Sequence, residues 1–431
     1  MNQRDAGLIR AVGPWGLAAS IISIVVGGGI FAVPAALAAS IGPFAPLAFL
    51  VCAVAVGSAA ICFAEGGSRI ASSGGAYVYI EAAFGPLSGY VAGTLLWFSD
   101  VLACGGIAAA LADVLVDPLP QTLKGPAHAA AIVGTVGGIA FANFGGVTSG
   151  MRLVKATTVL KLAPLVVFVV VGASAIHIGN FHPSQAPGSA GLGRAVILAI
   201  FALTGMESAL SASGEVAQPA RTIPRALALA LGSVTLLYVA IQVVAQGILG
   251  PALATSTVPL ADAMAQISPS LRLLLLAGAA ISLFGFMSGD ILATPRILFA
   301  FAREGLLPRA LGRVDPLSHA PRVAIGCYAV LAAGLALSGT FTELAVLSTV
   351  AIAPYYIGGC AAAWWLARRG VATAGEPLNF RWLGLAAVVG VAGMLALIAV
   401  ASRQEVAGLF VLMAVSAGVY VVQTQVKLRR A

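Results

Sequence analysis

The stretch Ile21-Ile-Ser-Ile-Val-Val-Gly27-Gly28-Gly29-Ile-Phe-Ala-Val-Pro34 places three consecutive glycines inside an apolar run. The run is long enough to cross a bilayer, which takes about 20 residues. Each glycine costs a helix interior about 1 kcal/mol relative to alanine, so three together should interrupt the helix. Interrupted backbone at membrane depth is tolerated only where it is buried in protein or lines a cavity. The sequence therefore predicts a broken membrane helix whose free backbone groups bind a ligand.

The composition is that of an integral membrane protein. Of the 431 residues, 60% are hydrophobic and 9% are charged, whereas a soluble domain carries about 25% charged residues. The cysteines show no metal-ligand spacing and are expected to be small buried hydrophobes; they are Cys52, Cys62, Cys104, Cys327 and Cys360. Residues 1–13 are expected to be retained, because the apolar run that follows them is too long for the core of a signal peptide.

We predict twelve membrane spans from the apolar runs and from the Gly, Pro and charged residues that separate them. Their approximate limits are 14–37, 43–64, 85–115, 127–145, 152–176, 192–213, 222–249, 270–301, 321–339, 342–367, 381–401 and 404–425. The more polar stretch 251–269 is expected to form short interfacial helices. The chain is therefore expected to be a single transmembrane domain over residues 1–431.

The basic residues predict the orientation of these spans. Most of the 23 Lys and Arg residues fall in loops on the amino-terminal side, and the opposite side carries Lys124, Arg194, Arg272 and Arg403. Cytoplasmic loops are the ones enriched in Lys and Arg, so both termini are expected in the cytoplasm. This placement also explains the net positive charge without nucleic-acid binding.

A second interruption lies in the sixth span, at Phe201-Ala-Leu-Thr-Gly205-Met-Glu207. A carboxylate in the middle of an apolar run costs about 2.5 to 3.5 kcal/mol on insertion scales. Spans one and six are five apart. Two glycine-interrupted helices in corresponding positions of two halves indicate an inverted-repeat transporter with its site near the bilayer midplane. The halves share no residue-level identity, so the two breaks alone predict the repeat.

Five motifs in order resemble the amino acid-polyamine-organocation superfamily of permeases. They are Gly27-Gly-Gly-Ile-Phe31, Phe63-Ala-Glu65 through Arg69 to Gly74-Gly-Ala-Tyr77, Phe201 to Glu207, Glu215-Val-Ala-Gln-Pro-Ala-Arg-Thr-Ile-Pro224, and Arg303-Glu-Gly-Leu-Leu-Pro308. The resemblance covers residues from about 10 to 425. It implies an all-α membrane fold similar to the sodium-coupled leucine transporter, with helices one and six unwound. Two inverted five-helix repeats would span about 14–176 and 192–367, and two further helices about 381–425.

The same resemblance implies a substrate site built from backbone groups. A half-helix amino terminus offers unpaired N–H groups and the positive end of a dipole to a carboxylate. The family's motif usually has Ser or Thr where this chain has Gly28, so that hydroxyl is absent here. The alternative is that the glycines only permit close helix packing. The resemblance assigns the substrate carboxylate to Val25, Gly27, Gly28 and Gly29, and the substrate amine to carbonyls of Phe201, Ala202 and Thr204 beside Gly205.

Two charged residues are expected to act in coupling. Relatives carry a lysine on the fifth helix, where its ammonium is thought to replace a sodium ion. We therefore expect Lys161 to bridge the unwound first helix and the eighth helix, with its protonation linked to opening; the alternative is that it snorkels to the headgroups. Glu207 is expected to support the second break by accepting backbone N–H bonds and orienting Thr204 and Gly205. Its alternative role is direct proton movement.

Three further residues are candidates for contact with the substrate. Asp290 on the eighth span could attract a cationic group, pair with Arg296, or lie one turn off the site. Asp100 on the third span raises the same question. Cys104, one turn later, occupies a place that looks toward the binding site in relatives.

Other polar residues are expected in gates or on solvated faces. Tyr355 and Tyr356 follow Pro354 in the tenth span and could contribute to a gate. The loop charges are expected to be solvated or to form an inner gate of ion pairs that breaks on opening; they are Arg69, Glu215, Arg221, Arg225 and Arg303.

The sequence thus predicts secondary active transport of amino acids across a bacterial-type inner membrane, by alternating access, coupled to protons and independent of sodium. One alternative is exchange or export of cationic amino acids or polyamines. The other is a sensor that binds amino acids without transport. No phosphate-binding loop or nucleophile elbow is present, so no enzyme activity is expected. Neither a cofactor nor a metal is expected; the partners are the substrate, protons and the bilayer.

Overall fold

The computed structural model describes residues 13–70, 76–145, 161–182, 187–207, 219–318, 320–373 and 377–428. Helices make up the regular structure of these residues, which contain no β-strand. The α-helices are α1 (Pro14–Val25), α2 (Val33–Ile41), α3 (Ala45–Arg69), α4 (Ala76–Phe84), α5 (Pro86–Val116), α6 (Gln121–Phe144), α8 (Leu162–Gly172), α9 (Ser189–Leu203), α11 (Pro219–Leu249), α12 (Pro259–Ala265), α13 (Pro269–Ala293), α14 (Pro295–Arg303), α15 (Arg322–Ser338), α16 (Phe341–Arg368), α17 (Leu383–Val400) and α18 (Arg403–Leu428).

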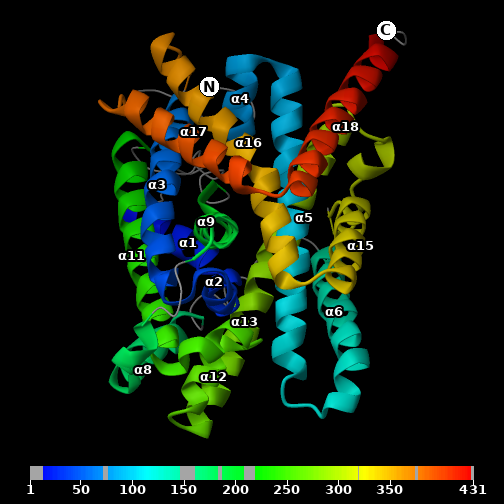
Figure 1. The fold of residues 1–431 in the computed structure, drawn as a ribbon. Helices are drawn as coiled ribbons and strands as arrows, with labels where there is room; N and C mark the ends of the chain where they lie inside the picture. Colours follow the sequence, from blue (N-terminus) through cyan, green and yellow to red (C-terminus); the bar gives the residue numbers. More distant parts are fainter. Residues whose placement is uncertain are drawn as a thin grey trace.

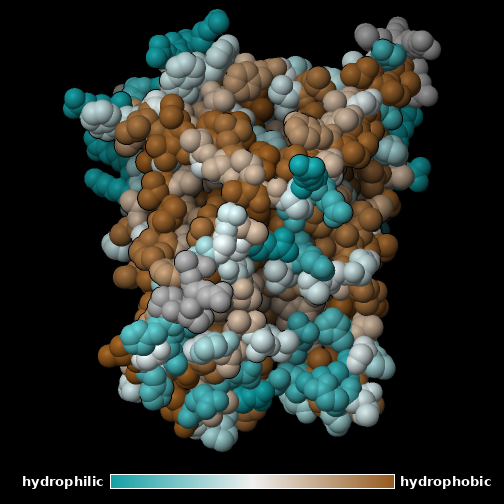
Figure 2. Space-filling view, in the orientation of Figure 1, coloured by the Kyte–Doolittle hydropathy of each residue, from teal (hydrophilic) through white to brown (hydrophobic). Residues whose placement is uncertain are grey.

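Eight helical stretches of the described chain are long and apolar enough to cross a membrane. They are Val33–Arg69, Pro86–Val116, Gln121–Phe144, Arg221–Thr255, Pro269–Arg303, Phe341–Arg368, Leu383–Val400 and Arg403–Lys427. Four shorter apolar helices are Pro14–Val25, Leu162–Ala175, Ser189–Leu203 and Arg322–Ser338. Figure 2 shows hydrophobic residues over most of the side of the molecule and hydrophilic residues mainly toward its two ends. The protein is therefore a multi-pass membrane protein.

Helices α1, α2 and α9 lie at the centre of the bundle. In Figure 1 they lie between α3 and α11 on one side and α5 and α16 on the other. Contacts between α2 and α9, between α1 and α11, and between α5 and α16 hold this arrangement. A Cβ on Gly191 of α9 would come within 2.3 Å of the Ser40 carbonyl oxygen, so glycine lets α9 approach the end of α2. The central helices are thus enclosed by protein, as interrupted membrane helices require.

The first break has the local cause that the glycines predicted. Helix α1 ends at Val25, and a short 3₁₀ turn, Gly29–Phe31, leads to α2. Pro34 lies in the first turn of α2, where its missing N–H removes no helical hydrogen bond. The second break follows α9, because Thr204 is extended and Gly205 has a φ of +111°. A left-handed φ of this kind is open to glycine and strained for other residues.

The structure corrects several predicted boundaries. The predicted span 270–301 is two helices, because Pro295 starts α14 directly after α13 ends at Ala293. Helix α6 begins at Gln121 rather than at 127 and contains Pro126. Helix α3 runs to Arg69, five residues beyond the predicted limit at 64. In the stretch 251–269, a 3₁₀ turn (Gly250–Thr255) and α12 form the expected short helices.

Candidate transport cavity

The two breaks face each other across a cavity of about 310 Å³. Gly29 of the first break packs against the second, since a Cβ on Gly29 would lie 3.3 Å from Cε1 of Phe201. The cavity wall includes every predicted site residue except Cys104, which is fully buried outside the lining. Those lining residues are Val25, Gly27, Gly28, Gly29, Lys161, Phe201, Ala202, Thr204, Gly205, Glu207 and Asp290. These residues therefore line one cavity, and their roles stay predictions.

Among the residues of the first break that line the cavity, two backbone donors have no acceptor in the described part of the chain. The N–H of Gly27 donates to the Val25 carbonyl at 2.7 Å, and Val25 itself is the last residue of α1. The carbonyls of Gly28 and Gly29 accept from Phe31 and Ala32, at 3.4 and 3.0 Å. No acceptor within the described ranges faces the N–H of Gly28 or Gly29. These two N–H groups are available to an anionic group, and the assignment of the carboxylate to Val25, Gly27, Gly28 and Gly29 stays a prediction.

Side chains from two distant helices hold the carbonyl groups of the same break. The Tyr238 hydroxyl on α11 donates to the Val25 carbonyl at 2.8 Å. The Ser282 hydroxyl on α13 donates to the Gly27 carbonyl at 2.6 Å. Both side chains are fully buried. Sequence reasoning missed these two residues, which satisfy carbonyl groups that an interrupted helix would otherwise leave without partners.

Replacing Ser282 with alanine is expected to lower the melting temperature of the purified protein. The Gly27 carbonyl would lose its donor, and an unsatisfied buried polar group costs about 1–3 kcal/mol. The matched control is Ser338→Ala, because the exposed Ser338 hydroxyl bonds only to the Leu335 carbonyl of its own helix, at 3.1 Å. Equal melting temperatures for the Ser282 variant and the wild type would show that the Ser282 bond carries no stability.

Lys161 lies directly before α8 and points into the core. Its ammonium donates to the Ser23 carbonyl of α1, and the residue is 4% exposed. Because it is buried and lines the cavity, it does not snorkel to the headgroups. The described residues show no hydrogen bond from Lys161 to α13, so the expected bridge to the eighth helix stays a prediction. The hydrogen bond between the first break and α13 is made by Ser282.

Glu207 bonds to the backbone of the second break. Both of its carboxylate oxygens lie 3.1 Å from the backbone nitrogen of Gly205. Tyr356 of α16 donates its hydroxyl to Glu207 Oε2 at 2.6 Å. The Thr204 hydroxyl, however, donates to the Phe201 carbonyl at 2.8 Å and is not oriented by Glu207. Glu207 thus links the left-handed Gly205 to α16, and the gate role of Tyr356 stays a prediction.

Two aspartates meet at another part of the cavity wall. Asp290 of α13 accepts hydrogen bonds from the Tyr328 hydroxyl of α15 and from Thr294, one turn along its own helix. Asp100 of α5 lies 3.0 Å from the same Thr294 oxygen. The alternative that Asp290 pairs with Arg296 is wrong: Arg296 Nη1 is buried with no partner in the described part of the chain. Arg296 lies in α14, beyond the end of α13, whereas Thr294 follows Asp290 by about one turn.

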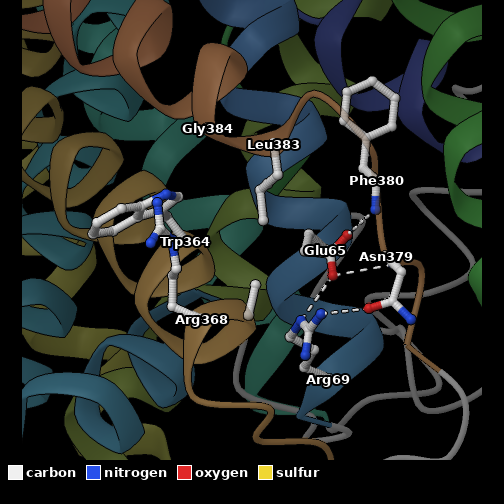
Figure 3. A pocket seen from close by; sticks show the side chains of 9 residues that line it. Glu65, Arg69, Trp364, Arg368, Asn379, Phe380, Leu383 and Gly384 are labelled. Atoms are coloured by element: carbon white, nitrogen blue, oxygen red, sulfur yellow. Dashed lines mark hydrogen bonds and ion pairs between the residues drawn. The ribbon is translucent and has the colours of Figure 1, made fainter.

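A second pocket, of about 350 Å³, lies outside this cavity, and Arg69 is one of the residues that line it. Arg69 is the last residue of α3 and 4% exposed, so the prediction that it is a loop residue is wrong. Its Nε lies 2.7 Å from Glu65 Oε1, and its Nη2 donates to the Asn379 side chain at 2.7 Å. Figure 3 shows the Glu65 and Arg69 side chains pointing from α3 to the segment before α17. Glu215 lies outside the described residues.

Glu65 completes a clasp between α3 and the segment after α16. Its carboxylate accepts the backbone N–H groups of Asn379 and Phe380, at 3.2 and 2.9 Å (Figure 3). The Ser68 hydroxyl accepts from the N–H of Leu378 at 3.0 Å. The N–H of Thr373 in turn donates to the Arg69 carbonyl at 2.7 Å. We call this network, centred on Glu65 and Arg69, the α3 clasp.

Comparison with known proteins agrees with a transport cavity. The family model described as amino acid permease matches residues 12–422. The branched-chain amino acid permease BcaP of Lactococcus lactis subsp. cremoris (strain MG1363) is 30% identical over 329 residues, which cover 68% of this chain and 68% of that protein. BcaP of Bacillus subtilis (strain 168) is 26% identical over 376 residues, covering 80% and 78%. The methylthioribose transporter of the same Bacillus strain is 27% identical over 372 residues, covering 81% and 80%.

The match to the family model extends over almost the whole chain and includes both breaks. The resemblance seen in the five sequence motifs is thereby confirmed, and the relatives named for a function are transporters rather than enzymes. This chain belongs to the amino acid permease family.

Proposed function

We propose that the protein is a secondary active transporter that carries amino acids by alternating access, with the cavity between the two breaks as its substrate site. The observation that carries the proposal is the pair of N–H groups at Gly28 and Gly29, which have no acceptor among the described residues and belong to the lining of a cavity large enough for an amino acid. Every amino acid has a carboxylate, and two N–H groups at an interrupted helix suit it. The carbonyls of the second break then receive the amine.

The proposed architecture has twelve spans, with α1 and α2 forming the first and α9 beginning the sixth. Its two inverted repeats place the breaks in corresponding positions, as in transporters whose site lies near the midplane. The excess of Lys and Arg on the amino-terminal side supports cytoplasmic termini in the inner membrane. Fusion of a reporter that is active only in the cytoplasm to residue 431 tests this orientation, and a silent fusion would contradict it.

The wall favours a neutral amino acid with an apolar side chain. Ile24, Ile107, Phe286 and Ile352 line the cavity together with Phe201. The relatives named branched-chain amino acid permease support the same class. We expect labelled leucine to be exchanged by the purified protein in sodium-free proteoliposomes, and unlabelled leucine to compete better than arginine or putrescine. Exchange of none of these compounds would overturn the proposal.

Cationic amino acids are the second candidate class, and Asp100 and Asp290 are the observation that favours them. Both carboxyl groups line the cavity and could receive a positively charged side chain. Stronger competition by arginine than by leucine in the same exchange assay would select this class.

Transport is further proposed to be coupled to protons, with Lys161 linking its charge to the position of α1. Lys161→Ala is expected to slow leucine exchange about tenfold to a hundredfold, since a hydrogen bond from a charged group contributes about 1.5–3 kcal/mol. The rate of leucine exchange by Lys161→Ala is also expected to depend less on pH. Lys124→Ala is the control, because Lys124 lies in α6, outside the cavity lining. A Lys161 variant with the wild-type rate and pH dependence would remove Lys161 from the mechanism.

A further inference from the structure

The carboxyl groups of Asp100 and Asp290 are joined through a single hydroxyl group. Thr294 Oγ1 lies 3.0 Å from Asp100 Oδ2 and 3.0 Å from Asp290 Oδ1. The two carboxyl oxygens are therefore at most 6.0 Å apart. The Tyr328 hydroxyl donates to the other oxygen of Asp290, Oδ2. Three helices, α5, α13 and α15, and the residue between α13 and α14 thus meet at one point of the cavity wall.

The hydroxyl groups supply one hydrogen fewer than there are contacts in this arrangement. The structure has three oxygen–oxygen contacts at hydrogen-bonding distance, two made by Thr294 and one by Tyr328. A hydroxyl group carries one hydrogen, and an ionised carboxylate carries none. Two ionised carboxylates would have to share the single Thr294 hydrogen in a three-centre bond. A hydrogen on Asp100 or on Asp290 gives each of the three contacts its own hydrogen.

Two observations outside these contacts support a functional group rather than a structural one. Both carboxyl groups line the cavity that the proposed function makes the substrate site. The indole N–H of Trp97, one turn before Asp100 on α5, is buried with no acceptor among the described residues. The Trp97 ring packs edge-on to Tyr328 with their centroids 6.2 Å apart. A buried donor of this kind indicates that a water molecule or an ionised carboxylate completes the site in another state.

We propose that Asp100 and Asp290, bridged by Thr294, form a proton-binding pair that holds one proton in this conformation and releases it when the cavity wall moves. The proposal rests on the proposed transport function and adds a second titrating group to Lys161. Binding joins a proton from water to a carboxylate oxygen, and release returns it to water. A movement that separates α5 from α13 would break the contact between Asp100 and the Thr294 hydroxyl. Water would then solvate each carboxylate separately.

The surrounding groups are consistent with one shared proton. On α5 the neighbour is Cys104; on α15 it is Tyr328; and Glu207 beyond α9 and Lys161 before α8 line the same cavity. On α16, Tyr356 is occupied by Glu207, and Ser348 is hydrogen-bonded to Ser99 of α5 at 3.0 Å. Among these described groups none is a cation bonded to Asp100 or Asp290, which leaves a proton as the cation that the proposal assigns to the pair.

Infrared difference spectroscopy on the purified full-length protein at neutral pH tests the pair directly. We expect the C=O stretching band of a protonated carboxyl group in the wild type. This band is expected to be lost in both Asp100→Asn and Asp290→Asn, because either change leaves the remaining carboxyl group free to ionise. Asp113→Asn is the matched control on α5, since Asp113 pairs with His128 at 3.2 Å and does not line the cavity. A band that persists in both asparagine variants would overturn the proposal.

A transport measurement separates this result from the transport function itself. With an inward pH gradient of one unit, one coupled proton can raise the internal substrate concentration about tenfold. We expect wild-type protein and Asp113→Asn to accumulate leucine. For Asp100→Asn we expect a larger loss of leucine accumulation than of leucine exchange. Full accumulation by Asp100→Asn would overturn the proton-binding pair while leaving transport established. A wild type that exchanges no amino acid would instead contradict the transport function, with the infrared band still deciding the pair.

Discussion

Glu65→Ala is expected to lower the melting temperature of the purified protein more than removal of an ion pair at the surface. Glu65 is fully buried and binds Arg69 and two backbone N–H groups in the α3 clasp (Figure 3). Alanine would leave a buried guanidinium and two donors without their acceptor. Breaking a buried pair by removing one partner costs about 3–5 kcal/mol, because the other charge stays buried.

The measurement is thermal unfolding in one detergent, with Glu405→Ala as the control. Glu405 pairs with Arg194 at 3.0 Å, the Arg194 and Glu405 side chains are 33% and 15% exposed, and Glu405 also accepts the backbone N–H of Ser402 at 2.8 Å. A partly exposed pair contributes about 0–1 kcal/mol and a helix cap about 0.5–2 kcal/mol, so this control is expected to lose less stability than Glu65→Ala. The double variant Glu65→Ala, Arg69→Ala is expected to recover part of the loss, since it leaves no unpaired charge. If Glu65→Ala had the same melting temperature as Glu405→Ala, the α3 clasp would have no role in stability.

Gly205→Ala is expected to remove most amino acid transport while leaving a folded protein. The φ of +111° at Gly205 is a conformation that costs a residue with a Cβ about 1–3 kcal/mol. The alanine Cβ would also lie 3.3 Å from Cγ2 of Ile24, at the end of α1. The backbone of the second break must therefore shift, and the N–H that Glu207 holds shifts with it.

The matched control is another glycine, Gly232→Ala in α11, where a Cβ would meet nothing within 4 Å. This change is expected to be neutral or to stabilise the protein by about 0.5–1 kcal/mol, because alanine favours a helix interior. Leucine exchange per reconstituted molecule is the readout, with the melting temperature measured alongside. Wild-type exchange by the Gly205 variant would show that the conformation of the second break does not limit transport.

The breaks could be predicted from the sequence because their causes are local. Three adjacent glycines and a Thr-Gly pair in apolar runs interrupt a helix whatever surrounds them. Glu207 could be placed for the same reason, since it binds a backbone group two residues away. Residues of both breaks line one cavity, and the sequence predicted a shared site from the proposal that the breaks correspond in two repeats.

The side chains that hold the first break could not be found in this way. Tyr238 and Ser282 bind carbonyl groups 213 and 255 residues away in the chain. A buried tyrosine or serine in an apolar span has the same sequence signal whether or not it reaches such a carbonyl. Arg69 was misplaced because α3 continues through Glu65-Gly-Gly-Ser, where two glycines favour an end to the helix. Only the clasp, formed with residues about 310 positions later, accounts for the helical ending at Arg69.

The hydrogen bonds from Tyr238, Ser282 and Lys161 affect the free energy of ligand binding at the first break. Tyr238 and Ser282 satisfy carbonyls at Val25 and Gly27, and Lys161 satisfies the Ser23 carbonyl of α1, so side chains of the surrounding protein stabilise the interrupted backbone. A binding site that is already preorganised loses little conformational entropy when its ligand enters. In the proposed transport cycle, the free energy of substrate binding would then be available for rearranging the helix bundle, because none of it would be needed to unwind α1.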